Sequence, residues 1–234
     1  MNTFIWTDLS TYYPRASLAF YQEVFRWEIT PFEGYFLAHQ GYNEIAGVYE
    51  TPAFFQEINM PHFWMNYIKV EDLHLVTSKA GNLGGKVELD NEPFYGGRIS
   101  LIRDPMGAGF TIYEGNNLNQ SRKSDHGCVI GRELHTSDVN KVQNFYASLF
   151  NWKFKEGVLN GIYEVYYEDQ FVCSVSELSN DLKGKFEYWT TIFKVDDLPV
   201  TLAIIEEKGG VVISNEGQRF MCCDPYKEAF FYIQ

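Results

Sequence analysis

The sequence predicts an α+β fold of tandem βαβββ modules, two per domain, whose curved mixed sheets enclose a cleft and carry helices on the outside. Three observations predict it: an internal repeat, short segments of alternating apolar and polar residues, and longer segments with apolar residues at helical spacing. The repeat is clearest at the two strand-like openings. "IWTDLST" at 5–11 runs in step with "IGRELHT" at 130–136, so that Asp8 matches Glu133.

The repeat covers nearly the whole chain. "AFYQEVFRWEI" at 19–29 matches "NFYASLFNWKF" at 144–154, and Trp64 matches Trp189. A polar stretch without periodicity separates the halves, as expected of a linker. We therefore predict a first domain at 1–116, a linker at 117–127 and a second domain at 128–234.

Each element of the first module has its own signal. Alternation predicts a strand at 3–9, and Leu18, Tyr21 and Val24 at helical spacing predict a helix at 14–25, with Pro14 suited to its first turn. Three strand-like segments follow at 27–32, 35–40 and 44–50, and then a loop at 51–61.

The second module repeats this order. A strand is predicted at 63–70, and a helix at 71–83 that the pair Gly84-Gly85 ends. Three further strands are predicted at 86–90, 98–104 and 109–115. Pro105 and Gly107 in "DPMG" suit the tight turn before the last of them.

The composition excludes several classes of function. A net charge of −12 with no basic cluster disfavours nucleic acid, and no apolar run is long enough for a membrane span. The first residues lack the pattern of a signal peptide, so a cytoplasmic location is expected. The four cysteines show no CxxC spacing and are expected to be reduced thiols.

The tandem modules, the "DL…AFY…FxW" opening and the "DPxG" turn together resemble the vicinal oxygen chelate superfamily, which includes glyoxalases, bleomycin-resistance proteins and extradiol dioxygenases. The resemblance is greatest to two-domain glyoxalase-like proteins. It implies a cleft over each curved sheet. In enzymes of this superfamily, a His on the first strand and a Glu on the last strand of each module bind a divalent metal.

The residues at these implied ligand positions are poor metal ligands. They are Trp6, Gly47, Met65 and Thr111 in the first half, and Gly131, Ser174, Thr190 and Phe231 in the second. Such sites use imidazole, carboxylate or thiolate donors. We therefore expect no metal ion and no other cofactor.

Strand alternation places Trp6 and Asp8 on one face, and Gly131, Glu133 and His135 on the matching face. The complete set expected to line the clefts is Trp6, Asp8, Met65, Tyr67, Thr111, Gly131, Glu133, His135, Ser174, Thr190 and Phe231.

The two matched acids, Asp8 and Glu133, are open to two interpretations. They could anchor a polar ligand or act as bases, and Glu133 with His135 could position a general base. Alternatively, they accept hydrogen bonds from buried backbone or pair with Lys69 and Lys194, because a buried carboxylate without a partner is costly.

The leading functional hypothesis is binding of a small, partly apolar organic molecule without the usual metal, by a monomer or homodimer. One alternative is a lyase or dioxygenase of the same superfamily, with displaced metal ligands or an acid–base site at Asp8 or Glu133. Another is a non-catalytic interaction protein whose clefts are filled by side chains.

Overall fold

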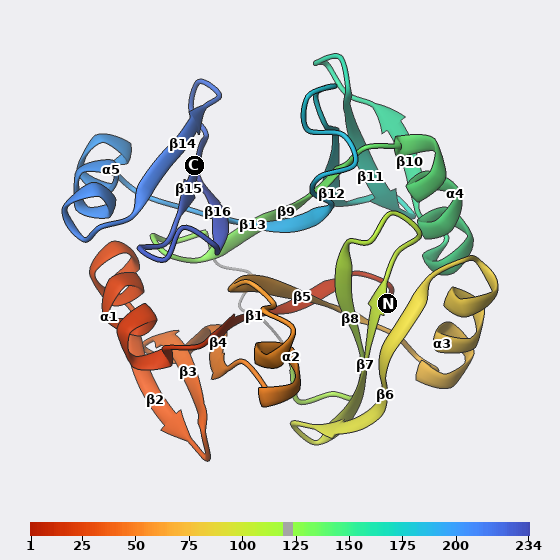
Figure 1. The fold of residues 1–234 in the computed structure, drawn as a ribbon, viewed down its shortest axis with the longest axis horizontal. Coiled ribbons are helices and arrows are strands. Elements are labelled where there is room, and N and C mark those ends of the chain that lie inside the picture. The colour runs from red at the N-terminus through yellow and green to blue at the C-terminus, as the bar shows by residue number, and fades with distance from the viewer. Residues whose placement is uncertain (119–123) are drawn as a thin grey trace. The chain divides into compact units, whose positions relative to one another are not determined.

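The predicted fold class is confirmed by the computed structural model, which describes residues 1–118 and 124–234 (Figure 1). The described strands form two eight-stranded sheets that mix parallel and antiparallel neighbours. Their strand orders are β2-β3-β4-β1-β5-β8-β7-β6 and β10-β11-β12-β9-β13-β16-β15-β14.

The first half follows the predicted order of elements. Its first module contains β1 (Phe4–Thr11), α1 (Pro14–Phe25), β2 (Glu28–Phe32), β3 (Tyr35–Gln40) and β4 (Asn43–Glu50). After the short helix α2 (Ala53–Glu57), its second module contains β5 (Phe63–Lys69), α3 (Leu73–Asn82), β6 (Lys86–Phe94), β7 (Gly97–Arg103) and β8 (Gly109–Glu114).

The second half repeats the same order. Its third module contains β9 (Val129–Thr136), α4 (Val139–Phe150), β10 (Lys153–Glu156), β11 (Ile162–Tyr167) and β12 (Gln170–Glu177). Its fourth contains β13 (Tyr188–Phe193), α5 (Leu198–Glu207), β14 (Val211–Asn215), β15 (Phe220–Cys223) and β16 (Phe230–Ile233).

Most predicted bounds differ from the structure by no more than about two residues, but two predictions are wrong. The segment predicted as a loop at 51–61 contains α2, which begins where the N–H groups of Phe55 and Gln56 donate to the Pro52 carbonyl. Strand β6 runs on to Phe94 instead of ending at residue 90, because two register shifts let it stay paired with β7. Such bulges depend on the partner strand, so periodicity within one strand does not reveal them.

The helix starts follow from short polar side chains. Asp72, Asp138 and Asp197 each accept a backbone N–H in the first turn of α3, α4 and α5, at 2.8, 3.0 and 3.0 Å. Helix α1 has Pro14 in its first turn instead, as predicted.

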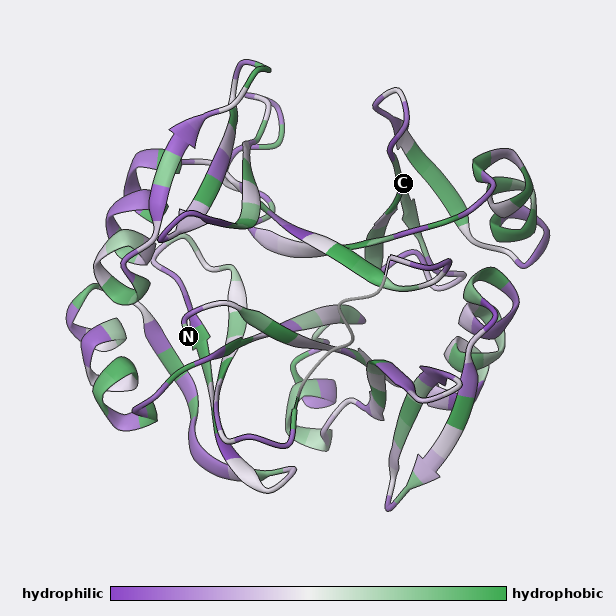
Figure 2. Ribbon diagram, turned by 180° about the vertical axis from the view of Figure 1, so that it is seen from behind, coloured by the Kyte–Doolittle hydropathy of each residue, from purple (hydrophilic) through white to green (hydrophobic). Residues whose placement is uncertain are grey.

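Hydrophobic and hydrophilic residues alternate around the helices (Figure 2), and the apolar side of α1 is buried. Among the described residues, no helix is long and apolar enough to cross a membrane.

The chain folds into two compact units, each built from residues of both sequence halves. Among the described residues, unit 1 comprises 1–5, 66–118 and 132–190, and unit 2 comprises 6–65, 124–131 and 191–234. The repeat thus divides the chain differently from these units, and the domain boundaries at 116 and 128 stay predictions. Residues 119–123 of the predicted linker lie outside the described residues.

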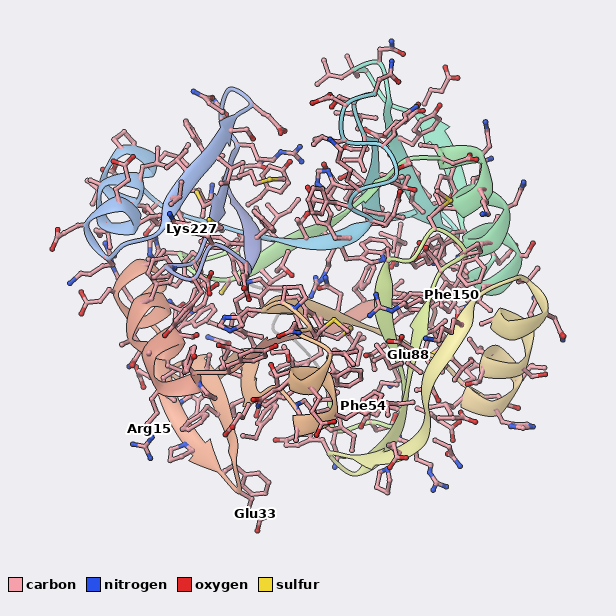
Figure 3. All side chains as sticks on the ribbon, in the orientation of Figure 1. Arg15, Glu33, Phe54, Glu88, Phe150 and Lys227 are labelled. Carbon is pink, nitrogen blue, oxygen red and sulfur yellow. The ribbon has the colours of Figure 1, made fainter. Side chains whose placement is uncertain are left out.

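Each unit has an aromatic core between helix and sheet. In unit 2, Tyr21 and Phe25 of α1 pack with Trp27 and Trp64. In unit 1, Tyr146 of α4 packs with Trp152 and Trp189 at the matching places. Most side chains labelled in Figure 3 lie outside these cores, such as Glu33, at the tip of the turn between β2 and β3.

Candidate functional site

The buried carboxylate of Glu133 lies at the centre of a polar cluster in unit 1. Its side chain is 1% exposed. Ser174 donates a hydrogen bond to Glu133 Oε2 at 2.8 Å, and Ser176 donates one to Oε1 at 2.7 Å. The parallel pairing of β9 with β12 positions both hydroxyls, because it sets Ser174 opposite Glu133 and Ser176 opposite His135.

His135 completes this cluster. Its Nε2 lies 3.3 Å from Glu133 Oε1, and its ring stacks on Tyr188 with 4.7 Å between ring centroids. The structure therefore brings together the carboxylate and imidazole that the sequence singled out. A carboxylate facing an imidazole can hold or exchange a proton.

Two neighbours of Glu133 have other roles. Thr190, predicted to line a cleft, donates its hydroxyl to the backbone carbonyl of Glu133 at 3.2 Å. Cys173 precedes Ser174 on β12, and burial, followed by the charge of Glu133, raises the pKa of its thiol well above its usual range. The thiol therefore stays protonated and apolar in character beside the acid.

Asp8, the matching acid in unit 2, is surrounded by aromatic side chains. Its carboxylate is fully buried, and Oδ1 accepts hydrogen bonds from Trp6 Nε1 and from the Tyr35 hydroxyl, both at 2.6 Å. Burial, and then the charge of Asp8, raise the pKa values of Tyr35 and Tyr49. Both phenols therefore remain protonated at neutral pH.

Gly47 allows Tyr35 to reach Asp8. It lies opposite Asp8 in the pairing of β1 with β4. A Cβ at this position would lie 1.7 Å from the Tyr35 hydroxyl and 2.2 Å from Asp8 Oδ1. A phenol therefore occupies the space that a side chain on residue 47 would need.

The two acids thus have different surroundings at the same register positions. The positions that face Asp8 and Ser10 on β4 carry Gly47 and Tyr49, whereas those that face Glu133 and His135 on β12 carry serines. Trp6 is likewise replaced by Gly131 in β9, where an added Cβ would lie 3.2 Å from Ile192 Cδ1. Glu133 is therefore bound by small hydroxyls where Asp8 is enclosed by rings.

The structure places the other predicted cleft residues separately. Met65 is buried, and its carbonyl accepts a hydrogen bond from Thr7 at 3.0 Å. Tyr67 faces Thr111 in the pairing of β5 with β8, and its ring stacks on Phe94.

The prediction for Phe231 is wrong, because its ring packs against Tyr21 and Phe25 in the core between helix and sheet. Phe231 and Ile233 are two residues apart in β16, so their side chains point to the same face of the strand, and Ile233 lies in the same core.

The donor set does not fit the metal that the resemblance implies. Within residues 1–118 and 124–234, no three His, Cys, Asp or Glu side chains are grouped closely enough to hold a metal ion. Glu133 and His135 are two such donors, and Ser174 and Ser176, which donate to Glu133, are weak metal ligands. We therefore derive no chemistry through a metal.

Sequence reasoning missed three residues of these clusters, namely Ser176, Tyr188 and Tyr35. Ser176 has the same strand parity as Ser174, so alternation along "CSVSE" could have identified it. Tyr35 and Tyr188 come from other strands, and no spacing in the sequence links them to the acids.

Comparisons with known proteins support the fold. No protein-family model matches the chain. Proteins named "Putative glyoxylase CFP32" from Mycobacterium tuberculosis and Mycobacterium bovis are each 26% identical over 227 residues, covering 89% of this chain and 83% of theirs.

Three solved structures with a similar fold are named as enzymes. A Mn(II)-bound glyoxalase from Novosphingobium aromaticivorans has a TM-score of 0.65 at 9% identity, over 99% of this chain and 81% of its own. A 2,2',3-trihydroxybiphenyl 1,2-dioxygenase from Sphingomonas wittichii has a TM-score of 0.64 at 9% identity, over 100% and 90%. An extradiol ring-cleaving dioxygenase from B. fuscum has 0.66 at 11% identity, over 99% and 71%. At such low identity these structures establish the fold alone.

Proposed function

Because the chain has the fold of the vicinal oxygen chelate superfamily, we propose that it binds a small, partly apolar organic molecule without the metal ion that enzymes of the superfamily use. The carboxylate of Glu133 is the polar anchor for this molecule. The Ser174 and Ser176 hydroxyls hold the carboxylate in place.

The observation that carries the proposal is the set of small polar side chains around Glu133. A buried carboxylate is costly unless hydrogen bonds compensate its charge, and each of its oxygens can accept more than one. A hydroxyl or amine of a ligand can join the two serine hydroxyls and the imidazole as a partner of this carboxylate. Tyr188, stacked on His135, adds an aromatic surface, which small-molecule sites commonly use.

One observation favours a second candidate function. The 3.3 Å separation between His135 Nε2 and Glu133 Oε1 suits an acid–base pair, so the molecule bound at Glu133 could also be a substrate. In that case His135→Gln would abolish turnover but leave binding largely intact.

The test is a screen of a fragment library of small phenols, amines and carboxylic acids by ligand-observed NMR. We expect phenols or amines to bind wild-type protein, and Glu133→Gln to weaken them at least about tenfold, because a hydrogen bond to a charged group is lost. Asp8→Asn is the matched control and should leave their affinity unchanged. Circular dichroism checks that both variants fold.

Two outcomes would overturn the proposal. One is a set of hits whose affinity does not depend on Glu133. The other is a stoichiometric divalent ion in protein purified without chelator, bound at the Glu133 cluster.

A further inference from the structure

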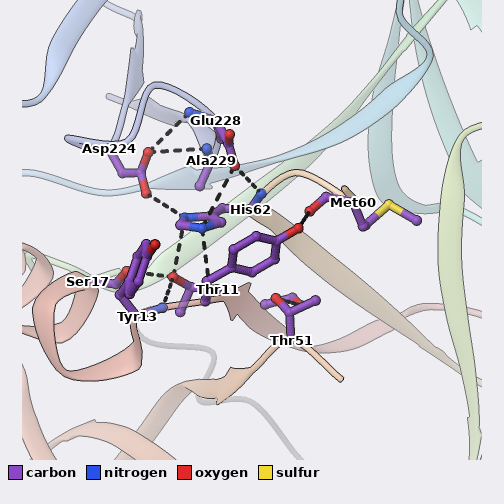
Figure 4. A network of polar contacts seen from close by, with 11 residues as sticks. Thr11, Tyr13, Ser17, Thr51, Met60, His62, Asp224, Glu228 and Ala229 are labelled. Atoms are coloured by element: carbon purple, nitrogen blue, oxygen red, sulfur yellow. Dashed lines mark hydrogen bonds and ion pairs between the residues drawn. The ribbon is translucent and has the colours of Figure 1, made fainter. Parts of the chain in front are cut away.

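His62 of unit 2 is a buried imidazole that the proposed function does not use. It directly precedes β5, its side chain is 3% exposed, and it lies among the end of β1, the start of α1 and the turn before β16 (Figure 4). Its Nε2 lies 3.3 Å from the backbone nitrogen of Tyr12.

Unit 1 binds the matching backbone amide differently. Glu187 stands at the place of His62 in the repeat, and its carboxylate accepts the N–H of Ser137, which matches Tyr12, at 3.0 Å. In both units, therefore, a side chain accepts the backbone N–H that directly follows β1 or β9. This side chain directly precedes β5 in unit 2 and β13 in unit 1. A carboxylate accepts over the whole neutral range, whereas an imidazole nitrogen accepts only while it carries no proton.

The contacts of His62 determine its tautomer. An amide can only donate, so Nε2 must be the unprotonated nitrogen of the neutral ring. The proton then lies on Nδ1, which is 3.3 Å from Thr11 Oγ1 and 3.6 Å from Asp224 Oδ2.

The charged and titratable groups that face His62 would accommodate a second proton. Asp224 is fully buried, its Oδ1 accepts the N–H groups of Glu228 and Ala229, and its Oδ2 makes no hydrogen bond to any described residue. Glu228 Oε2 accepts the backbone N–H of His62 at 2.8 Å and lies 3.8 Å from Nε2.

Three tyrosine rings complete these surroundings. The rings of Tyr12, Tyr13 and Tyr226 lie 5.0, 6.0 and 4.8 Å from the His62 ring, centroid to centroid. The neighbouring carboxylates stabilise a cation through charge-assisted hydrogen bonds.

We propose that His62 is a proton-dependent latch on the segment that joins β1 to α1. The neutral ring accepts the Tyr12 N–H. The protonated ring cannot accept it and donates from Nε2 to Glu228 instead, which releases the Tyr12 amide.

The released segment borders a cavity of unit 2. Tyr13 stacks on Tyr226 and lines a cavity of about 450 Å³ together with Arg15, Phe36 and Glu50. Release of the Tyr12 amide therefore loosens one wall of this cavity, and the latch makes the cavity sensitive to pH.

Solution NMR of the full chain tests the latch. At about pH 8, ring nitrogen shifts should show His62 protonated at Nδ1, the tautomer less common in free imidazoles. Between about pH 8 and pH 5, the Tyr12 amide should lose about fivefold in protection against hydrogen exchange. That factor corresponds to one ordinary hydrogen bond. The Ser137 amide, held by Glu187, is the internal control and should keep its protection.

Variants separate the latch from general loosening at low pH. His62→Gln places an amide oxygen near the same amide and cannot be protonated, so Tyr12 protection should become independent of pH. His39→Gln, at an imidazole 3.7 Å from Glu28 in the same unit, should leave the Tyr12 response unchanged. A ring protonated at Nε2 at about pH 8, or a Tyr12 amide no more sensitive than Ser137, would overturn the proposal. The tautomer measurement decides alone if His62→Gln does not fold.

Discussion

The hydroxyl of Tyr146 donates a hydrogen bond of 3.1 Å to Asp104 Oδ2 inside unit 1. The same hydroxyl accepts one from Trp189 Nε1 at 3.1 Å. Asp104 Oδ1 meanwhile accepts the N–H groups of Met106 and Gly107, so this carboxylate joins helix α4 to the turn before β8. At the matching place in unit 2, the Tyr21 hydroxyl makes no hydrogen bond to Asp224.

We predict that Tyr146→Phe lowers the free energy of unfolding by about 2 kcal/mol, because it leaves a buried carboxylate oxygen and an indole N–H without a partner. Tyr21→Phe is the matched variant and should cost well under half as much, since it breaks no hydrogen bond to a carboxylate. Urea unfolding measures both. Equal costs would show that the hydrogen bond to Asp104 contributes nothing to stability.

Gly47→Ala should be destabilising despite the small change. The new Cβ would overlap the Tyr35 hydroxyl and Asp8 Oδ1, so the phenol must leave the acid. Overpacking of this kind costs about 1–3 kcal/mol, with the lost hydrogen bond in addition. Thermal unfolding and the ultraviolet difference spectrum of the displaced tyrosine measure it.

Gly81→Ala is the control for that substitution. Gly81 lies in α3, and a Cβ there would meet nothing within 4 Å. Alanine is the better helix former, so this variant should be about 0.5–1 kcal/mol more stable than wild type. A stabilising Gly47→Ala or a destabilising Gly81→Ala would contradict the packing around these two glycines.

The pair Glu88–Arg103 should make stability depend on pH. Burial raises the pKa of Glu88, but the hydrogen bond and charge of Arg103, whose Nε lies 2.9 Å away, lower it to a net value below the usual range. Because the folded pKa is the lower one, the stabilisation is present above the unfolded pKa of about 4.3 and is lost as pH falls through the folded value.

We therefore expect Glu88→Gln to cost about 0.5–1 kcal/mol at neutral pH, the range of exposed ion pairs, and to cost progressively less as pH falls below about 4.3. Urea unfolding at several pH values tests this expectation. Lys86→Gln should change little, because the Lys86 side chain is 74% exposed. A cost of Glu88→Gln that stays constant down to about pH 3 would refute the role of its charge.

The cysteines should resist alkylation in the folded protein. Cys128, Cys173, Cys222 and Cys223 are all buried and form no disulfide. Burial, followed by the charge of the neighbouring Cys223, raises the pKa of Cys222 to about 12, so the reactive thiolate is scarce. We expect iodoacetamide to label the native protein no faster than the protein unfolds, and to label all four thiols in denaturant. Mass spectrometry measures both. Rapid labelling of one thiol in the native protein would mean that its surroundings open locally.

The order of the elements could be read from the sequence because it depends on signals within short segments. Asp72, Asp138 and Asp197 begin helices through a hydrogen bond to an amide three residues away, so the partner is already in the sequence. The internal match of Asp8 with Glu133 likewise needs no knowledge of packing.

The surroundings of the two acids could not be read in this way. Tyr35 reaches Asp8 because β3 pairs with β4 and because Gly47 leaves room, and Ser176 reaches Glu133 because β12 pairs in parallel with β9. The sequence suggested buried backbone as the donor to the acids, whereas Asp8 accepts hydrogen bonds from the side chains of Trp6 and Tyr35. Lys69, considered as its partner, donates to Asn116.

By itself, the sequence determined the duplicated βαβββ order and two acids at matching places, since repeats and periodicity are properties of the chain alone. Only the tertiary structure decided that Asp8 is enclosed by the rings of Trp6 and Tyr35, whereas Glu133 faces serines and an imidazole. It also decided that Phe231 belongs to a core and that His62 holds a backbone amide. The physical reason is that these contacts join residues far apart in the chain, and strand register and side-chain volume set them.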